Sequence, residues 1–350
     1  MNVGVVDLFC GIGGLSYGLK TAGLQVVAGY DIDKTCAYAY ETNNKSKFNY
    51  KDVRAIHGEE IKSQLKDFQI KVLAGCAPCQ PFSSYAFKNK QKDPNKYDLL
   101  YEFSRLIREV EPDIVTMENV PQLLSFRIKP VFADFVKTLQ TLGYDVSVNK
   151  VYCPDYGIPQ SRTRLVLLAS KLGKIQMIEK THSKDNYITT RDAICALPPI
   201  AAGGQDPMDP LHRARHLSPL NLKRIKATPY GGSWQDWPEE LRLECHKKSE
   251  GKTWTNVYGR INWDEPSPTM TTLCTGYGNG RFGHPTQDRA LSVREAALLQ
   301  TFPKEYQFFE DEESISIAKA SRYIGNAVPP KLGEVIGKSI TKHIEEYYYE

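Results

Sequence analysis

The sequence predicts an α/β protein with a doubly wound, mostly parallel sheet and a second, smaller and irregular unit. Short apolar runs alternate with amphipathic stretches from residue 3 to residue 169. A glycine-rich turn follows the first apolar run, and the composition changes between residues 171 and 288. Alternating strands and helices are typical of a parallel sheet with helices on both faces. In such sheets ligands bind beyond the carboxyl ends of the strands, so functional residues are expected there.

The apolar runs are expected to form the strands of the sheet, at 3–9, 26–30, 71–74, 113–117, 146–152 and 165–169. The amphipathic stretches between them are expected to form helices at 13–22, 33–43, 98–110 and 129–142. Two further helices are expected near the C-terminus, at 293–300 and 331–348. The last one follows Pro329-Pro330, and proline is favoured in the first turn of a helix.

Length and composition exclude several classes of protein. A chain of 350 residues suits about two domains of roughly 150 residues each. With 41% hydrophobic and 25% charged residues, it is neither a disordered chain nor a disulfide-dense miniprotein. No apolar stretch approaches the ~18 residues of a membrane span, and the start lacks the basic segment of a signal peptide. The protein is therefore expected in the cytoplasm, away from membranes, where its eight scattered cysteines would stay reduced.

The second unit is predicted from where particular residue types fall. All four Trp and five of the seven His lie between residues 171 and 288, together with sixteen Lys and Arg against thirteen Asp and Glu. Most of the formal net charge of +4 therefore belongs to this region. The tract 198–210 is rich in Pro, Gly and Asp, and it is expected to be a loop or linker inside the unit.

The turn Gly11-Ile-Gly13-Gly14 follows the first strand, with Ser16 where a dinucleotide-binding fingerprint has its third glycine. By itself such a turn fits a nucleoside-binding loop and a plain tight turn about equally well. Asp31 ends the second strand 20 residues after Gly11, where a carboxylate can accept both hydroxyls of a ribose. Asp52 could take an adenine amino group. Together these features predict an adenosine-type ligand, and Ser16 argues against NAD.

Two cysteines, Cys76 and Cys79, come directly after the third expected strand. Zinc binding would need a second Cys or His pair at similar spacing, which the sequence lacks, so no metal is expected. A redox dithiol of the thioredoxin type would continue into a helix, which Pro81 disfavours. A cysteine buried as a small hydrophobe would leave Pro78 and Pro81 unexplained. The remaining interpretation makes Cys79 a nucleophile at the mouth of a cleft in the sheet.

Glu118-Asn119 end the next apolar run, at the end of another expected strand. A carboxylate there would point into the same cleft as Cys79, although an acid that caps a helix would give the same pattern. Gln160, Arg162 and Arg164 precede the last expected strand. Residues two apart share one face of an extended segment, so Arg162 and Arg164 are expected side by side.

With these residues the chain resembles the DNA cytosine-C5 methyltransferases of bacterial type. The match is ordered and nearly end to end, and only 171–288 lies outside it, although Pro266-Ser-Pro-Thr269-Met-Thr271 near its end is also similar. The motifs that carry the resemblance are Asp7-Leu-Phe-Cys-Gly-Ile-Gly-Gly14, Asp31, Asp52, Pro78-Cys79-Gln80, Glu118-Asn119-Val120, Gln160 with Arg162 and Arg164, Arg289 to Ala296 with Gln300 to Pro303, and Gly325 to Pro330.

The resemblance implies a Rossmann-like fold of the class I S-adenosylmethionine-dependent methyltransferases. Residues 1–170 and 289–350 would form a discontinuous catalytic domain that binds S-adenosyl-L-methionine, and 171–288 would form a target-recognition domain. The implied reaction is methyl transfer to C5 of a flipped-out cytosine in a specific sequence of double-stranded DNA, in a restriction–modification system. A monomer is expected, with any cognate restriction endonuclease encoded separately.

The resemblance also implies roles for individual residues. Cys79 would attack C6 of the cytosine, Glu118 would bond N3 and the exocyclic amine, and Arg164 would hold the O2 side. Gln80, Asn119 and Arg162 would complete the catalytic group, whereas the base that removes the C5 proton is not identified. The cofactor would be bound by Phe9, Gly11, Ile12, Gly14, Asp31, Ile32, Asp52, Val53, Pro78, Leu99, Asn326 and Val328.

The second unit is expected to read the DNA and to offset the cost of flipping the base. Its candidate DNA-binding residues are Arg213, Arg215, Arg224, Arg260, Thr269, Thr271 and Arg281, with Lys223 and Lys226 as further basic groups. The basic segment 88–96, after Cys79, could fold over DNA or be an ordinary solvated charge run.

Two other functions are possible alternatives to DNA cytosine methylation. A tRNA cytosine methyltransferase of eukaryotic type would carry Cys-Phe-Thr in the second unit, where the nearest string of this chain is Leu273-Cys274-Thr275. A non-catalytic DNA-binding protein on the same fold would be expected to have lost Cys79 or Glu118, and both are present.

Overall fold

The computed structural model describes residues 2–78, 98–125, 130–249 and 251–349. Its internal contacts divide the chain into two units. The first comprises Met1–Tyr156, Thr163–Thr181 and Ala327–Glu350, and the second Gly157–Arg162 and His182–Asn326. The division differs from the predicted boundaries mainly at 289–326, which group with the second unit instead of the first.

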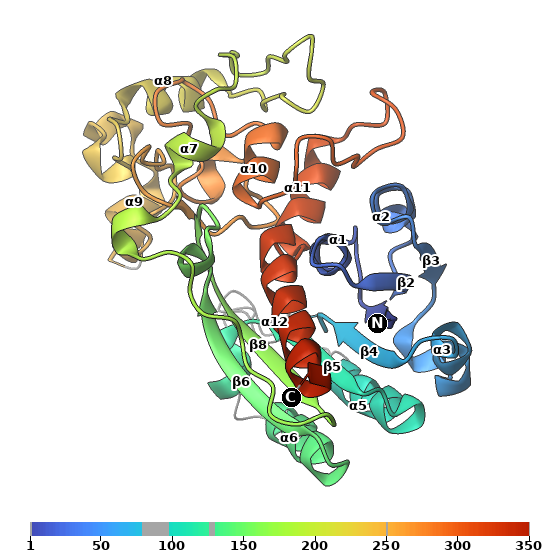
Figure 1. The fold of residues 1–350 in the computed structure, drawn as a ribbon. Helices are drawn as coiled ribbons and strands as arrows, with labels where there is room; N and C mark the ends of the chain where they lie inside the picture. Colours follow the sequence, from blue (N-terminus) through green and yellow to red (C-terminus); the bar gives the residue numbers. More distant parts are fainter. Residues whose placement is uncertain (1, 79–97, 126–129, 250, 350) are drawn as a thin grey trace. The chain divides into compact units, whose positions relative to one another are not determined.

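The first unit is built on a seven-stranded sheet with the strand order β3-β2-β1-β4-β5-β8-β6 (Figure 1). The strands are β1 (Val3–Leu8), β2 (Gln25–Asp31), β3 (Lys47–Tyr50), β4 (Ile70–Gly75), β5 (Ile114–Asn119), β6 (Asp145–Tyr152) and β8 (Thr163–Ser170). Neighbouring strands are parallel except for β8, which runs antiparallel to β5 and to β6. The predicted α/β class with a mostly parallel sheet is confirmed.

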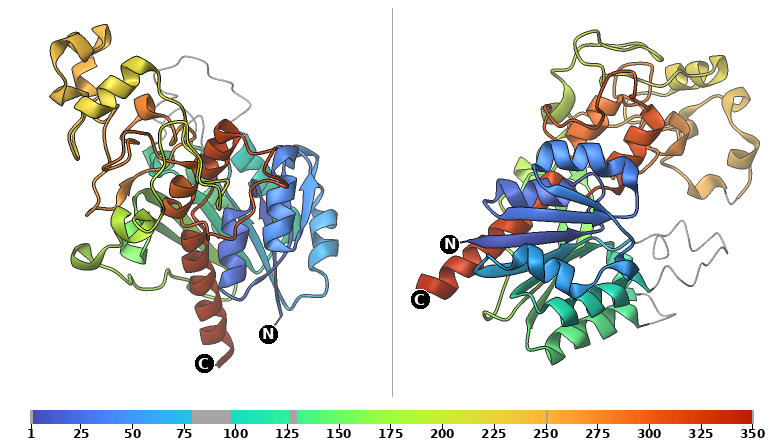
Figure 2. Two further views of the ribbon diagram at one scale, coloured as in Figure 1. Left: turned by 90° about the horizontal axis from the view of Figure 1, so that it is seen from above. Right: turned by 90° about the vertical axis from the view of Figure 1, so that its right-hand side faces the viewer.

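Helices cover both faces of this sheet, as in other doubly wound folds. They are α1 (Gly14–Thr21), α2 (Ala37–Asn44), α3 (Gly58–Leu65), α5 (Leu99–Val110), α6 (Val131–Thr141) and α12 (Pro330–Tyr349). The right-hand view of Figure 2 shows α1 and α2 on one face and α3, α5 and α6 on the other. Helix α1 packs on α12, and α5 packs on both α3 and α6. Short 3-10 turns lie at Lys34–Cys36, Val53–Ala55, Pro121–Ser125 and Cys153–Tyr156.

Helix α5 shows how the sequence positions the sheet edge. Its apolar residues recur three or four positions apart, which buries one face made of Leu100, Phe103, Leu106, Ile107 and Val110. The Phe103 ring lies 5.4 Å from the Phe135 ring, between centroids. A Cβ on Gly75 would lie 2.9 Å from the Phe103 ring, so glycine lets α5 approach the end of β4. Strand β4 ends at this glycine, directly before Cys76.

The second unit has little regular structure among its described residues. Its helices are α7 (Thr190–Ile194), α8 (Pro219–Ala227), α9 (Glu244–Lys247), α10 (Val293–Leu299) and α11 (Ile317–Asn326), and its strands β7 (Gln160–Ser161) and β9 (Ser267–Pro268) pair in parallel. Short 3-10 turns lie at Lys184–Asn186, Trp234–Asp236, Glu239–Leu241, Gly251–Thr253 and Tyr277–Asn279. Helix α10 packs on α7 and α11. Trp234 and Trp237 lie in the hydrophobic core of this unit, together with Ile225, Tyr277 and Ala290.

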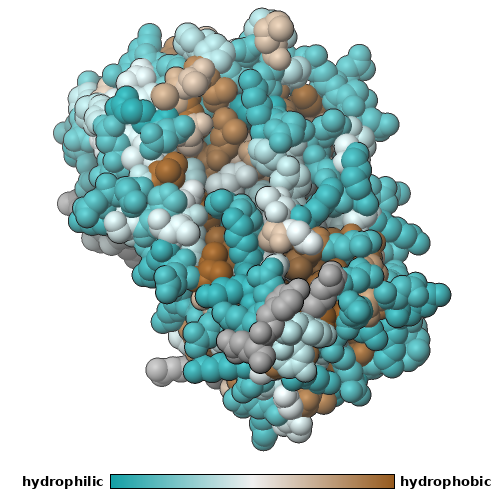
Figure 3. All heavy atoms as spheres, in the orientation of Figure 1, coloured by the Kyte–Doolittle hydropathy of each residue, from teal (hydrophilic) through white to brown (hydrophobic). Residues whose placement is uncertain are grey.

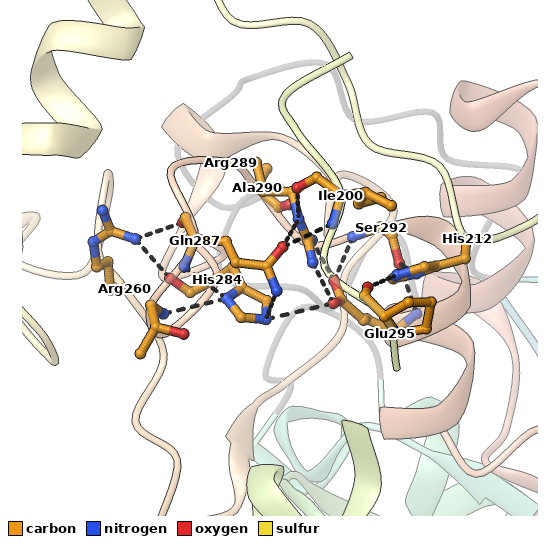
Figure 4. Close-up of polar contacts among 11 residues, drawn as sticks. Ile200, His212, Arg260, His284, Gln287, Arg289, Ala290, Ser292 and Glu295 are labelled. Carbon is orange, nitrogen blue, oxygen red and sulfur yellow. Dashed lines mark hydrogen bonds and ion pairs between the residues drawn. The ribbon is translucent and has the colours of Figure 1, made fainter. Parts of the chain in front are cut away.

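Buried polar contacts also hold the second unit together (Figure 4). Two nitrogens of Arg289 each donate a 2.7 Å hydrogen bond to Glu295, and both side chains are buried. Burial by itself would raise the pKa of Glu295, but the bonds from Arg289 outweigh it and hold that pKa below its usual value. Burial also lowers the pKa of the neighbouring His284 to about 4. His284 is therefore neutral at pH 7, and Arg289 supplies the positive charge beside Glu295.

Glu295→Ala is expected to destabilise the second unit by about 3–5 kcal/mol, because it leaves the buried charge of Arg289 without its partner. Denaturant unfolding followed by tryptophan fluorescence measures this loss, since all four Trp lie in the second unit. Glu244→Ala is the matched control, because it removes an exposed ion pair with Lys247 and should leave the unfolding midpoint near that of the wild type. Equal midpoints for the two variants would contradict the role of the buried pair.

No helix within the described part of the chain is both long and apolar enough to cross a bilayer. The face of the molecule drawn in Figure 3 is largely hydrophilic, with separate patches of hydrophobic residues. Within the same described residues, no group of three or more His, Cys, Asp or Glu side chains could hold a metal ion.

Candidate active site

Glu118 lies at the end of β5 in the first unit, and only 3% of its side chain is exposed. Strand β8 is antiparallel to β5, with Asn119 paired to Leu165. The beginning of β8 therefore lies at the same edge of the sheet as the carboxyl ends of the parallel strands. This places Nε of Arg164 2.9 Å from Oε1 of Glu118. The structure thus brings together two residues that the sequence analysis assigned to one site.

The carboxylate of Glu118 is held at both of its oxygens. Arg164 contacts Oε1, and the thiol of Cys76 donates to Oε2 with a sulfur–oxygen distance of 2.9 Å. Only 13% of the Arg164 side chain is exposed, so water and salt screen this ion pair weakly. From the sequence, Cys76 was predicted only as half of a metal or redox pair, and its contact with Glu118 was not predicted.

Asn119 braces the turn that follows β4. Its Nδ2 donates to the carbonyl oxygen of Ala77 at 3.1 Å, and its Oδ1 accepts from the N–H of Val120 at 2.8 Å. Pro78 is exposed at the end of this described segment. Cys79 and Gln80, which the sequence analysis placed in the catalytic group, lie outside the described residues, as does the basic segment 88–96.

Asp31 ends β2 and holds the glycine-rich turn that follows β1. Its Oδ2 accepts from the N–H of Gly11 and its Oδ1 from the N–H of Asp33, both at 2.8 Å. Burial raises the pKa of Asp31, although these two bonds act in the opposite direction. Asp31 therefore joins the first two strand ends, where the sequence analysis expects a ribose.

Glycine is required in this turn at two positions. Gly13 has a φ of +90°, and a Cβ there would lie 2.1 Å from Nδ2 of Asn44. A Cβ on Gly14 would lie 2.2 Å from the carbonyl oxygen of Val328. Val328 therefore packs directly on the turn. Asn326, the other C-terminal residue predicted to bind the cofactor, ends α11 in the second unit.

Ser16, which stands where a dinucleotide fingerprint has glycine, binds a buried acid. Its hydroxyl donates to Oδ2 of Asp7 at 2.6 Å and lies 3.2 Å from the hydroxyl of Tyr40. Burial raises the pKa of Asp7 to about 7, against the effect of the Ser16 bond. The departure from the dinucleotide pattern therefore has a structural reason, because Ser16 is the hydrogen-bond donor to Asp7.

Phe9, Ile12 and Leu99 lie around the same turn or at the start of α5. Phe9 has a φ of +60°, a left-handed conformation that costs a residue other than glycine roughly 1–3 kcal/mol. Ile12 is buried, and Leu99 is partly buried against the core of the first unit. All three stay candidates for cofactor contacts.

The predicted purine contacts lie at the ends of β2 and β3. Ile32 is 63% exposed and offers apolar surface to a ligand, whereas Val53 is buried. Asp52 is paired with Arg54 at 3.1 Å, so an adenine amino group would share its carboxylate with that arginine. Tyr50, which is also 63% exposed and pairs with Asp31 in the sheet register, was missed by the sequence analysis. Recognition of β3 as a strand would have pointed to Tyr50.

Arg162 lies in a different unit from Arg164. It belongs to the second unit, where it is buried and donates to the carbonyl oxygen of Met270 at 3.2 Å. Gln160 lies beside it, with Oε1 accepting from the N–H of Met270 and Nε2 donating to Gln300. These bonds tie β7 to 267–270 and to the end of α10. Arg162 stays a candidate catalytic residue, and its contacts in the structure brace the second unit.

Arg260, predicted to contact DNA, is also buried in the second unit, with 5% exposed. Its guanidinium donates to the carboxylate of Asp288 and to the carbonyl oxygens of Ile225, Thr228, His284 and Gln287. A unit with few helices and strands leaves many carbonyl groups without a regular partner, and the five N–H donors of arginine can satisfy them. Arg260 stays a candidate for a DNA contact, with its donors bonded inside the unit in this structure.

Other predicted DNA-binding residues are held in the same way. Arg224 donates to the carbonyl oxygen of Leu241, Arg281 to those of Gly231 and Gly232, Arg213 to that of Pro210, Arg215 to the hydroxyl of Thr275, and Thr269 to the carbonyl oxygen of Ser161. Thr271 is exposed, as are Lys223 and Lys226 on α8. Of these arginines, Arg224 is buried and Arg213, Arg215 and Arg281 are partly buried, so the fully exposed residues are the better placed to reach a partner.

The sequence was compared with known families and proteins. The family model described as C-5 cytosine-specific DNA methylase matches residues 3–342. The Type II methylase M.HgiDII of Herpetosiphon aurantiacus is 53% identical, over 97% of this chain and 96% of the relative. The Type II methyltransferase M.Sau96I of Staphylococcus aureus is 30% identical, over 98% of this chain and 76% of the relative.

Solved structures show the same fold. A DNA modification methyltransferase encoded within an E. coli prophage superposes with a TM-score of 0.74 at 24% identity, covering 98% of this chain and 100% of that chain. The S. pombe Dnmt2 methyltransferase superposes with a TM-score of 0.65 at 18% identity, covering 99% of both chains.

Proposed function

This chain belongs to the C-5 cytosine-specific DNA methylase family, and on that premise we propose its reaction. It transfers a methyl group from S-adenosyl-L-methionine to C5 of a cytosine flipped out of a specific duplex DNA sequence. Cys79 forms a covalent bond to C6 of that cytosine during the reaction. The observation that most directly supports the proposal is the buried pair of Glu118 and Arg164, at the sheet edge that also carries Asp31.

Cytosine C5 is a weak carbon nucleophile and has to be activated. Addition of the Cys79 thiolate to C6 breaks the aromaticity of the ring and makes C5 an enamine carbon, which can take a methyl group. When bound, S-adenosyl-L-methionine would supply that group from its sulfonium, whose S–CH3 bond would break and leave a neutral thioether. A base then removes the proton from C5, and the electron pair of that C–H bond expels the thiolate from C6.

As the thiolate adds to C6, Glu118 passes a proton to N3 and so neutralises the negative charge that would otherwise develop on the ring. Bonded to N3 and to the exocyclic amine, it stabilises the adduct more than the free base, which is the condition for catalysis. Arg164 holds Glu118 in place and lies on the O2 side of the base. Because Glu118 is nearly inaccessible to water, these interactions are stronger than they would be in solution.

The residues around the glycine turn fit S-adenosyl-L-methionine. A Cβ on Gly11 would meet no atom within 4 Å, so the space beside the turn is open to a ligand. Each oxygen of Asp31 accepts one backbone N–H, and a carboxylate oxygen has a further lone pair for a ribose hydroxyl. Ile32 and Tyr50 offer exposed apolar surface for the purine.

We further propose that the second unit recognises the DNA sequence. Flipping a base costs a few kcal/mol, and contacts from this unit would offset that cost. Lys223 and Lys226 are exposed on α8, where they can neutralise phosphates. The protein would act as a monomer in a restriction–modification system whose endonuclease is encoded separately.

Bisulfite sequencing of a plasmid exposed to the enzyme and S-adenosyl-L-methionine tests the function. We expect one cytosine within a fixed short sequence to become resistant to conversion at every occurrence, because C5 methylation slows bisulfite deamination. Omission of the cofactor is the control. Methyl transfer to tRNA but not to the plasmid, measured with labelled cofactor, would show that the substrate is wrong.

A further inference from the structure

The thiol of Cys76 lies beside the carboxylate of Glu118 because of the strand register. Strands β4 and β5 are parallel neighbours, with Gly75 opposite Met117, so the next residues, Cys76 and Glu118, leave the sheet side by side. The N–H of Cys76 donates to the carbonyl oxygen of Leu8 at 3.3 Å, which ties its main chain to β1. From this fixed position Sγ reaches Oε2 of Glu118 at 2.9 Å.

Contact at both oxygens fixes the plane of the Glu118 carboxylate. The last side-chain torsion of glutamate has broad, weakly defined minima, so a single contact with Arg164 would leave the carboxylate free to turn about Oε1. The second contact, from Cys76 to Oε2, removes that freedom. Orientation matters here because N3 and the exocyclic amine of cytosine lie next to each other in one plane, and only a coplanar carboxylate can meet both.

A thiol suits this purpose better than a stronger donor. It is a weak hydrogen-bond donor, so it can orient Oε2 without saturating it, and a lone pair of that oxygen stays available to the amine of the base. A lysine or arginine at the same position would add a second full positive charge and compete with the base for the carboxylate.

The same two strand ends are joined a second time. Nδ2 of Asn119 donates to the carbonyl oxygen of Ala77 at 3.1 Å. The segment after β4 therefore donates one hydrogen bond to the end of β5, through Cys76, and accepts one from it, at Ala77. The two segments therefore hold each other, and a shift of one displaces the other.

We propose that Cys76 is a positioning residue for methyl transfer, which holds Oε2 of Glu118 so that the carboxylate lies in the plane of the target cytosine. The assignment rests on the proposed function, because it takes Glu118 to be the residue that binds the base. Cys76 itself does not touch the reacting atoms. It acts before the base arrives by setting the orientation that Glu118 presents.

Cys76→Ala is expected to lower kcat by about 10- to 100-fold, because a misplaced catalytic group loses most of its effect. KM for DNA and for S-adenosyl-L-methionine should stay within about twofold of the wild type, since the contact matters mainly after the base is bound. Cys76→Val, which fills the position with an apolar side chain that has no donor, should lose as much. Cys76→Ser, which restores a donor, should recover kcat to within about threefold.

The exchange of the C5 hydrogen of cytosine with solvent gives a second readout. Without methyl transfer, reversible addition of a thiolate to C6 lets C5 take up a solvent proton and then lose either hydrogen. We expect the exchange rate to fall with kcat in Cys76→Ala and Cys76→Val and to recover in Cys76→Ser. Cys153→Ala is the control for loss of a buried thiol in the same unit, and it should leave kcat unchanged.

Two results would overturn the assignment of Cys76. One is a wild-type kcat in Cys76→Ala and Cys76→Val. The other is a Cys76→Ser variant as slow as Cys76→Ala, since the side chain would then act through its packing and not through its donor. A wild-type enzyme that methylates no cytosine in duplex DNA would instead overturn the proposed function, and with it this inference.

Discussion

Cys79→Ala is expected to abolish methyl transfer to DNA, lowering it by at least about 10⁴-fold, as loss of a catalytic nucleophile does in other enzymes. Without the thiolate, C6 receives no electron pair and C5 does not become an enamine carbon. Binding should be kept, because alanine removes a single sulfur atom and leaves the DNA contacts of the second unit in place. Transfer of labelled methyl groups to plasmid DNA measures the loss, and a gel shift with duplex DNA measures the binding.

Cys195→Ala is the matched control for this variant. Cys195 is an exposed cysteine of the second unit, so its loss should change neither transfer nor binding. Undiminished transfer by Cys79→Ala would exclude a covalent mechanism through this residue. Loss of DNA binding together with transfer would show that Cys79 supports the structure, and its catalytic role would then need separate proof.

The fold class could be predicted because buried strands of a parallel sheet are short apolar runs. The elements that escaped prediction have weak patterns. Strand β3 is an edge strand of four residues with only Phe48 buried, so it shows no apolar run. Helix α3 buries only Gly58, Ile61 and Leu65, which is too short a stripe to stand out from a polar loop.

The candidate site could be predicted only in part, because strand direction depends on long-range pairing. The sequence places Arg162 and Arg164 two residues apart, which suggests a shared face. In the structure the chain passes from one unit to the other between them. The reversed direction of β8 then places Arg164 at Glu118, while Arg162 binds Met270. Local spacing could not show this difference.

The extent of the second unit and the use of its arginines depend on the same kind of long-range contact. Residues 289–326 carry family motifs, which suggested that they return to the first unit. In the structure Arg294 pairs with Asp209 at 2.6 Å, and the N–H of Val293 donates to the carbonyl oxygen of Arg213. A basic residue in a recognition unit suggests a DNA contact, but the sequence does not reveal which guanidinium groups are already used by internal carbonyls.

Glu118→Gln is expected to lower kcat by about 10²- to 10³-fold, the usual effect of removing one preorganised electrostatic contact at a reacting group. The amide cannot transfer a proton to N3, so the negative charge that the thiolate brings to the ring is not neutralised. It also offers one acceptor oxygen where the carboxylate has two, so Arg164 and the exocyclic amine would compete for it. Initial rates measured over a range of DNA concentrations separate kcat from KM.

Glu59→Gln is the control for this variant, because it removes a carboxylate that is 83% exposed and paired only with a surface lysine on the same helix. Both variants should bind S-adenosyl-L-methionine as the wild type does, since neither residue lies at the glycine turn. A rise in KM for DNA with kcat unchanged would mean that Glu118 binds the free base and the transition state equally. Glu118 would then contribute affinity only, and activation of C5 would have to come from Cys79 and Arg164 alone.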